Sequence, residues 1–373
     1  MGKYDKDRHQ KEMAIRYCLA RGITPCLEVL VPSASDLSDS VETLTDIDVI
    51  GLEFIADGGF RRTIFDCKTS NKMSPINRAF WASGLLSYTN CNDAIVILKN
   101  RAVYNHRISA LKIEVDLHDE VSFQNLARTF DQEFGRDNSY QASIDRWNKL
   151  YECYEKNEWS KDLYDICRNT APITGEPWRV FRRVLVDMRA VRGQFNPDKD
   201  THVTIFFDML SAVFVMWSLL GRDIRRLHDP KMTKDEFETA LRYYIWGGKE
   251  SYHIRQELRQ RMGPAGSGQE FPAWDRFVKL AGIVISAPQD VFVCVGICRD
   301  LAIRTICGRH EDHEKKLEQD LRVNRRSRQF VMAVTDYMVS ASGIPKEFNT
   351  RVQDSLRLAE ESDTKDIKNM TSS

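Results

Sequence analysis

Two acidic residues and one lysine near the N-terminus have the types and spacing that phosphodiester chemistry needs. Asp66 and Lys68 lie two residues apart in an alternating apolar run. Successive side chains of a strand point to opposite faces, so these two should share a face. The preceding apolar run carries Asp46 and Asp48, and the turn signal at Asp57–Gly59 predicts a hairpin that sets the two runs side by side. Two or three carboxylates and one ammonium group should therefore converge.

Hydrolysis of a phosphodiester bond uses this combination of groups. A Mg²⁺ ion held by hard oxygen ligands polarises the phosphate and lowers the pKa of a bound water. A neighbouring lysine can orient that water and stabilise the negative charge of the transition state. Lys68 is placed for this role. Acid-x-Lys triplets also arise by chance in so charged a chain, as at Asp229–Lys231, but that triplet lies outside any alternating strand.

The residues resemble the PD-(D/E)xK, or restriction endonuclease-like, nuclease superfamily over about the first 110 residues. The resemblance rests on a helix bearing the acid Glu12, an Asp entering an apolar strand, and Asp66-Cys67-Lys68 followed directly by a helix. It implies that Glu12, Asp48, Asp66 and Lys68 form the catalytic site. It also implies that Asp48, Asp66 and Glu12 bind Mg²⁺, with Mn²⁺ able to substitute, and that the substrate is nucleic acid, DNA rather than RNA.

Three alternatives stay open at this point. Asp46 competes with Asp48 for the first metal ligand, although the apolar strand begins directly after Asp48. Glu28, in the middle of an apolar strand, is a substitute for Glu12 because its burial without a partner or a metal would be costly. The chain could also be a catalytically inactive nuclease-fold subunit that binds nucleic acid or acts as a scaffold, but no acid of the motif is missing.

Several arginines are candidates for contact with a nucleic-acid backbone. Arg78 lies in the first turn of the helix that follows Lys68, where it could reach a phosphate at the mouth of the site. Arg182, Arg183 and Arg189 recur at helical spacing in a later segment. A solvated helix face is the alternative interpretation of each group.

The elements expected to position these residues alternate between helix and strand. They are a helix at 7–20, strands at 26–31, 47–55 and 63–68, a helix from 75, a strand at 94–98 and a further strand at 111–115. This order indicates an α/β fold with a mixed sheet flanked by helices, of the restriction-endonuclease-like type that the resemblance implies.

The remainder of the chain has helical periodicity, and 373 residues suit two domains. We expect a nuclease-like domain at 1–135, an all-α domain at 136–358 and a polar tail at 359–373. The helical domain would serve target recognition, self-association into a homo-oligomer or binding of a partner protein.

Composition limits the classes of function. The 54 basic and 54 acidic residues leave no net charge, so nucleic-acid contact must use local patches. The polar N-terminus carries no apolar signal segment, which predicts a cytoplasmic protein. The apolar run Met209–Leu220 is too short to cross a membrane, for which about 20 residues are needed, and predicts a buried core helix. The resemblance favours a role in defence against foreign DNA.

Overall fold

The computed structural model describes residues 5–33, 42–69, 73–262 and 271–360. Contacts between residues divide the chain into two compact units. Unit 1 holds the residues up to 56 together with 60–151 and 168–175, and unit 2 holds 57–59, 152–167 and the residues from 176 onward. Of the predicted polar tail, residues 361–373 lie outside the described part of the chain, while 359 and 360 close the last helix.

Unit 1 contains a five-stranded mixed sheet in the order β1-β2-β3-β4-β5. The strands are β1 (Thr24–Pro32), β2 (Thr43–Phe54), β3 (Phe60–Lys68), β4 (Asp93–Leu98) and β5 (Val115–Asp119). The first three pair antiparallel, whereas β3, β4 and β5 pair parallel. The predicted hairpin between the two acid-bearing runs is therefore confirmed as β2 and β3.

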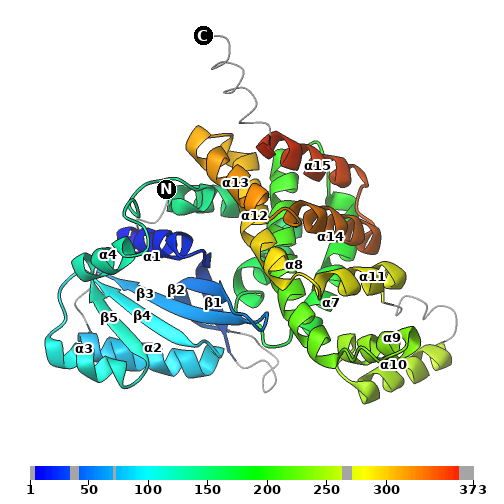
Figure 1. The fold of residues 1–373 in the computed structure, drawn as a ribbon, viewed down its shortest axis with the longest axis horizontal. Helices are drawn as coiled ribbons and strands as arrows, with labels where there is room; N and C mark the ends of the chain where they lie inside the picture. Colours follow the sequence, from blue (N-terminus) through cyan, green and yellow to red (C-terminus); the bar gives the residue numbers. More distant parts are fainter. Residues whose placement is uncertain (1–4, 34–41, 70–72, 263–270, 361–373) are drawn as a thin grey trace, which may run out of the picture. The chain divides into compact units, whose positions relative to one another are not determined.

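Helices cover both faces of this sheet. They are α1 (Arg8–Ala20), α2 (Pro75–Thr89), α3 (Tyr104–Leu111) and α4 (Glu120–Arg128). The next helix, α5 (Ile144–Glu155), belongs to unit 1 up to Tyr151. Figure 1 shows α1 and α4 on one face and α2 and α3 on the other. Tyr17 of α1 packs against Phe65 of β3 and Phe123 of α4, with ring centroids 5.8 and 5.1 Å apart, and these rings form the core on the α1 face. The predicted α/β class with flanking helices is confirmed.

Local sequence signals explain where α2 begins and ends. The Ser74 hydroxyl accepts a hydrogen bond from the backbone N–H of Asn77 at 3.3 Å, and Pro75 occupies the first helical turn. Asn90 closes the helix in the left-handed conformation, with φ of 54°. The helix carries the chain from β3 back to the start of β4, which a parallel pair requires.

The fifth strand differs from the sequence-based prediction. A strand was expected at 111–115, but Leu111 is the last residue of α3 and β5 begins at Val115. Within β5 the buried residues Val115 and Leu117 alternate with more exposed ones, which is the pattern of a half-buried strand. The run of apolar residues before Val115 belongs to the helix instead.

Unit 1 also extends beyond residue 135, where the sequence suggested a boundary. The Tyr151 hydroxyl donates to the backbone carbonyl of Leu27 at 2.9 Å. The Arg62 guanidinium donates to the carbonyls of Pro172 and Thr174, each at 2.8 Å. Residues 136–151 and 168–175 are therefore part of the first unit.

Unit 2 is helical, and the described residues after Asp119 contain no strand. Its helices are α6 (Lys161–Asp165), α7 (Pro177–Ala190), α8 (Asp200–Leu227), α9 (Lys234–Ile245), α10 (Lys249–Met262), α11 (Trp274–Val284), α12 (Pro288–Cys307), α13 (Glu311–Val323), α14 (Ser327–Ser342) and α15 (Glu347–Glu360). The predicted helical C-terminal part is confirmed.

The centre of unit 2 is α8, with α12 running beside it (Figure 1). By length and composition α8 could cross a membrane, but its most apolar window is wholly buried among the other helices. The core helix of a soluble protein passes the same test. This burial agrees with the sequence-based prediction of a core helix.

Candidate functional site

Three acids lie in a row across the sheet of unit 1. Val49 of β2 pairs with Phe65 of β3, so the next residues in each direction, Asp48 and Asp66, face each other across the antiparallel pair. In β1, Leu27 pairs with Val49 and Val29 pairs with Ile47. Glu28 of β1 therefore lies opposite Asp48. Directly opposed side chains share one face of the sheet. The register of the strands, set by their apolar residues, thus aligns three carboxylates.

Asp48 and Asp66 are each only 3% exposed. Like charges directly opposite one another destabilise a sheet, and burial of a carboxylate adds a further cost. Burial raises the pKa of Asp48 above its usual value. Burial also raises the pKa of Asp66. With the opposing effect of Arg78 and the supporting effect of the nearby Asp48 charge, that pKa is about 6. Such a pair is an unfavourable element of the fold, which is the pattern of a functional site.

The Lys68 ammonium lies among the carboxylates at the end of β3. Its Nζ is 3.1 Å from Asp48 Oδ2, 3.9 Å from Asp66 Oδ1 and 3.7 Å from Asp7 Oδ2. Burial alone would lower the pKa of Lys68, but the charges of Asp48 and Asp66 outweigh it and raise that pKa. The backbone N–H of Cys67 also donates to Asp48 Oδ2 at 2.8 Å. The predicted convergence of Asp48, Asp66 and Lys68 is thus present in the fold.

Arg78 contacts the same site from the first turn of α2. Its Nε lies 2.7 Å from Asp66 Oδ2. That oxygen is buried and accepts no hydrogen bond of proper geometry, so the contact is an ion pair alone. The guanidinium also lies over the ring of Trp81, 5.0 Å from its centroid. Arg78 is therefore already engaged with Asp66 in the protein itself.

Lys11 is a member of the cluster that the sequence-based reasoning missed. Its Nζ lies 2.9 Å from Asp5 Oδ2, 2.9 Å from Glu28 Oε1 and 3.5 Å from Asp48 Oδ1. Although burial opposes it, the charges of Asp48 and Glu28 raise the pKa of Lys11. A signal for this was available, because Lys11 continues the stripe of α1 that buries Ala14 and Cys18.

Glu28 has an unusual backbone, with φ of 52°. This left-handed conformation is strained in a residue other than glycine and asparagine, and such strain gathers at functional sites. The Arg168 guanidinium holds the residue in place, donating to both the Glu28 carbonyl and Oε2 at 2.7 Å. The substitute acid suggested by the sequence thus lies next to the site.

Glu12 does not join the other three predicted catalytic residues. Its Oε1 accepts from the backbone N–H of Ile144 at 3.2 Å, and its other contacts are Arg8 at 3.4 Å and Arg16 at 3.8 Å. The structure therefore does not bring Glu12 together with Asp48, Asp66 and Lys68 as the sequence suggested. Neighbouring residues of a helix point about 100° apart, and it is Lys11 that faces Asp48.

Asp46, the competitor of Asp48, is exposed two residues earlier on β2. Asp48 is the one that is buried and paired with Lys68. The geometry therefore favours Asp48.

The donor set fits a divalent cation bound by few protein ligands. Within the described ranges no group of three or more His, Cys, Asp or Glu residues is placed to hold a metal ion. Mg²⁺, however, commonly takes one or two carboxylates and completes its shell with water and substrate phosphate. Asp48 and Asp66 offer hard oxygens, and Asp66 Oδ2 is held by the ion pair with Arg78 at 2.7 Å. A bound cation would relieve the repulsion between these two carboxylates.

The three arginines predicted on the later helix all lie on α7 in unit 2. Arg183 pairs with Asp165 at 3.0 Å and Asp187 at 3.3 Å. Arg182 lies over the ring of Trp178, and Arg189 is exposed. Arg183 is therefore neutralised within the unit, whereas Arg182 has no such carboxylate pair among the described residues.

Comparisons with family models, curated proteins and solved structures find no match for this chain. The chemistry of the site therefore has to be inferred from its own residues.

Proposed function

We propose that unit 1 is a metal-dependent nuclease of the PD-(D/E)xK type, hydrolysing phosphodiester bonds. The observation that carries this proposal is the opposed, buried pair Asp48 and Asp66 with the Lys68 ammonium 3.1 and 3.9 Å from their oxygens. Two buried carboxylates that face each other destabilise the fold, and binding of a metal ion and a phosphate would explain why they are there.

The arrangement of the elements supports the same proposal. A helix, three antiparallel strands, a helix and a parallel strand follow one another, with Asp66 and Lys68 at the end of the third strand. This order accords with the restriction-endonuclease-like core that the sequence resembles. The proposal extends to that fold type.

Asp48 and Asp66 would hold Mg²⁺, for which Mn²⁺ can substitute. When bound, the ion supplies Lewis acidity and a water of lowered pKa. The two carboxylates fix its position relative to the strand ends, and burial keeps competing water from their oxygens. The role of Asp48 and Asp66 would thus be to position the metal ion.

Lys68 would act on the reacting phosphate through its charge. Its raised pKa keeps the ammonium protonated near neutral pH, so it donates hydrogen bonds to a phosphate oxygen as negative charge develops. Arg78, 2.7 Å from Asp66, would hold that carboxylate in place and present its other N–H groups at the mouth of the site. Both cations act without giving up a proton.

The wider biology follows from the resemblance alone. The substrate would be DNA rather than RNA, the protein would be cytoplasmic, and the role would be defence against foreign DNA. Unit 2 would contact the target through Arg182, Arg183 and Arg189, or would mediate self-association or binding of a partner protein.

A catalytically inactive nuclease-fold subunit is the second candidate, and one observation favours it. Lys11, Lys68 and Arg78 already pair with the acids of the site. A cluster whose charges are balanced internally can persist without a metal. In that case unit 1 would bind nucleic acid or act as a scaffold without cutting it.

A cleavage assay separates the two candidates. The purified full-length protein is incubated with plasmid, linear DNA and RNA, each with Mg²⁺, Mn²⁺ or EDTA. Cleavage that requires metal and disappears in Asp66→Ala supports the nuclease. Binding of nucleic acid without cleavage under all metal conditions supports the inactive subunit.

A further inference from the structure

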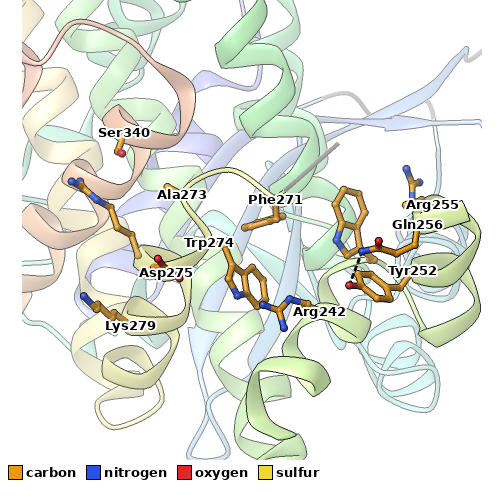
Figure 2. A pocket seen from close by; sticks show the side chains of 12 residues that line it. Arg242, Tyr252, Arg255, Gln256, Phe271, Ala273, Trp274, Asp275, Lys279 and Ser340 are labelled. Atoms are coloured by element: carbon orange, nitrogen blue, oxygen red, sulfur yellow. Dashed lines mark hydrogen bonds between the residues drawn. The ribbon is translucent and has the colours of Figure 1, made fainter. Parts of the chain in front are cut away.

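Unit 2 contains a cavity of about 900 Å³ between α9, α10 and α11. Aromatic and basic side chains line much of it, including Arg242, Trp246, Tyr252, Arg255, Trp274 and Lys279. Figure 2 shows Phe271 and Trp274 with Tyr252 and Arg255 to one side of them and Lys279 to the other. A smaller cavity of about 330 Å³ shares Trp246, Arg255 and Phe271 with it and adds Arg182. The larger volume is that of a small-molecule site.

Two arginines lie over the indole ring of Trp246, a residue that lines both cavities. Arg182 lies 4.9 Å and Arg255 also 4.9 Å from the ring centroid of Trp246, and Arg182 is 5.0 Å from that of Trp178. Burial, together with the like charges of Arg255 and Arg179, lowers the pKa of Arg182 to about 10. The buried Nε of Arg182 has no hydrogen-bond partner. These guanidinium groups are positioned by aromatic rings and not by carboxylates.

The remaining charges of the wall differ in how far they are neutralised. Arg242 lies over the Trp274 ring at 4.7 Å and pairs with Glu238 at 3.3 Å. In contrast, Arg255 and Lys279 have no ion pair within the ranges that the structure describes. Asp275 is the acid among the lining residues. The cavity therefore carries excess positive charge that an anion would neutralise.

We propose that these two adjoining cavities bind a nucleotide unit, with its phosphate at Arg182 and Arg255 of the smaller cavity and its base against the flat groups of Tyr252 and Arg242 of the larger one. Guanidinium groups recognise phosphate through paired N–H donors, which a bare lysine cluster does not provide. Aromatic rings and guanidinium planes stack on nucleobases. A simple anion would pair with the arginines but would not contact the aromatic side chains that line the cavity.

The unit could come from a free nucleotide or from a single strand of nucleic acid, since both present a base and a phosphate. The test measures binding to the full-length protein in EDTA, which keeps any metal-dependent cleavage out of the readout. The ligands are ATP, a fluorescein-labelled oligothymidylate and inorganic pyrophosphate, followed by calorimetry or fluorescence anisotropy. The outcome does not depend on the nuclease proposal, so the two can fail separately.

Arg255→Gln is the decisive variant because Arg255 is exposed on α10 and its removal relieves the repulsion with Arg182. Its melting temperature should be unchanged or higher, while its affinity for the nucleotide ligand falls about 10- to 100-fold. Lys279→Gln should weaken binding less, because a single flexible ammonium is lost. Arg325→Gln, an exposed arginine of unit 2 outside the lining, is the matched control and should bind normally.

Comparison of the ligands identifies the source of the nucleotide. Equal affinity for ATP and the oligonucleotide indicates a free nucleotide, whereas much tighter binding of the oligonucleotide indicates a strand. Both outcomes support the proposal if Arg255→Gln weakens them. Binding that is unaffected by both Arg255→Gln and Lys279→Gln, no binding of either ligand, or pyrophosphate binding as tightly as ATP, would overturn it.

Discussion

The two units of this protein arrange positive charge in opposite ways. In unit 1, Lys11, Lys68 and Arg78 surround buried carboxylates and are paired with them at 2.7 to 3.5 Å. In the cavity of unit 2, Arg182 and Arg255 lie on the indole of Trp246 and repel each other. One set of cations is neutralised by carboxylates of its own unit, and the other is positioned by an aromatic ring.

This difference determines what a substitution should change. Removing a charge from the cluster of unit 1 leaves a buried partner uncompensated, so stability, pKa values and turnover should move together. Removing the charge of Arg255, which lies over the ring of Trp246, should change binding alone. The following predictions test the comparison on the unit 1 side.

The largest effect is expected for the opposed carboxylates. Asp48→Ala and Asp66→Ala each remove a proposed metal ligand, so Mg²⁺-dependent cleavage should fall by about 10⁴-fold or more. Single-turnover cleavage of DNA measures this loss. Melting of the metal-free Asp48→Ala variant should fall, because Lys11 and Lys68 lose the buried carboxylate with which they pair.

Asp46→Ala is the matched control for these variants. Asp46 lies on the same strand as Asp48 but is exposed. The Asp46→Ala variant should cleave at the wild-type rate. That result would also show that Asp48, and not Asp46, is the acid of β2 in the catalytic site. Wild-type cleavage by both Asp48→Ala and Asp66→Ala would show that the chemistry lies elsewhere.

Lys68→Ala should have the next largest effect, a loss of about 100- to 1000-fold in the rate of cleavage. Metal binding should persist or tighten, since a positive charge 3.1 Å from Asp48 is removed. Lys68→Arg should restore little activity because its planar fork places the donors differently. Calorimetric metal affinity beside single-turnover cleavage checks both variants. If Lys68→Ala loses metal as completely as Asp66→Ala, the lysine is structural.

The sequence predicted the strands and the facing of Asp48, Asp66 and Lys68 because these depend on local periodicity. Alternation within β3 fixes which residues share a face, and the short hairpin fixes which strand lies beside it. The start of α2 at Ser74 and Pro75 followed from capping preferences. These features need no knowledge of distant contacts.

The partners of the site could not be predicted in the same way. Arg168 reaches Glu28 from 140 residues away in sequence, and no periodic pattern marks that contact. Glu12 was chosen over Lys11 because an acid was expected, although the buried stripe of α1 includes Lys11. Where an element ends also depends on packing, as the displaced start of β5 at Val115 illustrates.

The third prediction concerns the stability of the metal-free protein against pH. The pKa of Asp66 in the folded state is raised from 3.8 to about 6, so the folded protein binds this proton more tightly than the unfolded chain. Between pH 4 and 6 the contribution of this group to stability should therefore fall as pH rises, by roughly 3 kcal/mol in total. Above that range it should stay constant.

Asp66→Asn provides the comparison because it cannot ionise. Chemical unfolding in EDTA across pH 4 to 8 measures the free energy of unfolding of both proteins. The variant should gain stability relative to the wild type as pH rises to about 6 and then no more. A difference between the two curves that is independent of pH would contradict the raised pKa.

The smallest effect is expected for Arg78, and it compares the two units directly. The Arg78 guanidinium opposes the rise in the pKa of Asp66, so Arg78→Gln should raise that pKa further. The pH at which the metal-free stability levels off should then move upward. Arg128→Gln, an exposed arginine of α4, should leave it unchanged. Arg255→Gln should also leave it unchanged, since Arg255 belongs to unit 2 and its guanidinium lies over the ring of Trp246. The measurement is the unfolding series used for Asp66→Asn. If Arg255→Gln displaced the levelling point as far as Arg78→Gln does, the charges of the two units would not be of different kinds, and the contrast between an internally neutralised cluster and an anion-binding cavity would be wrong.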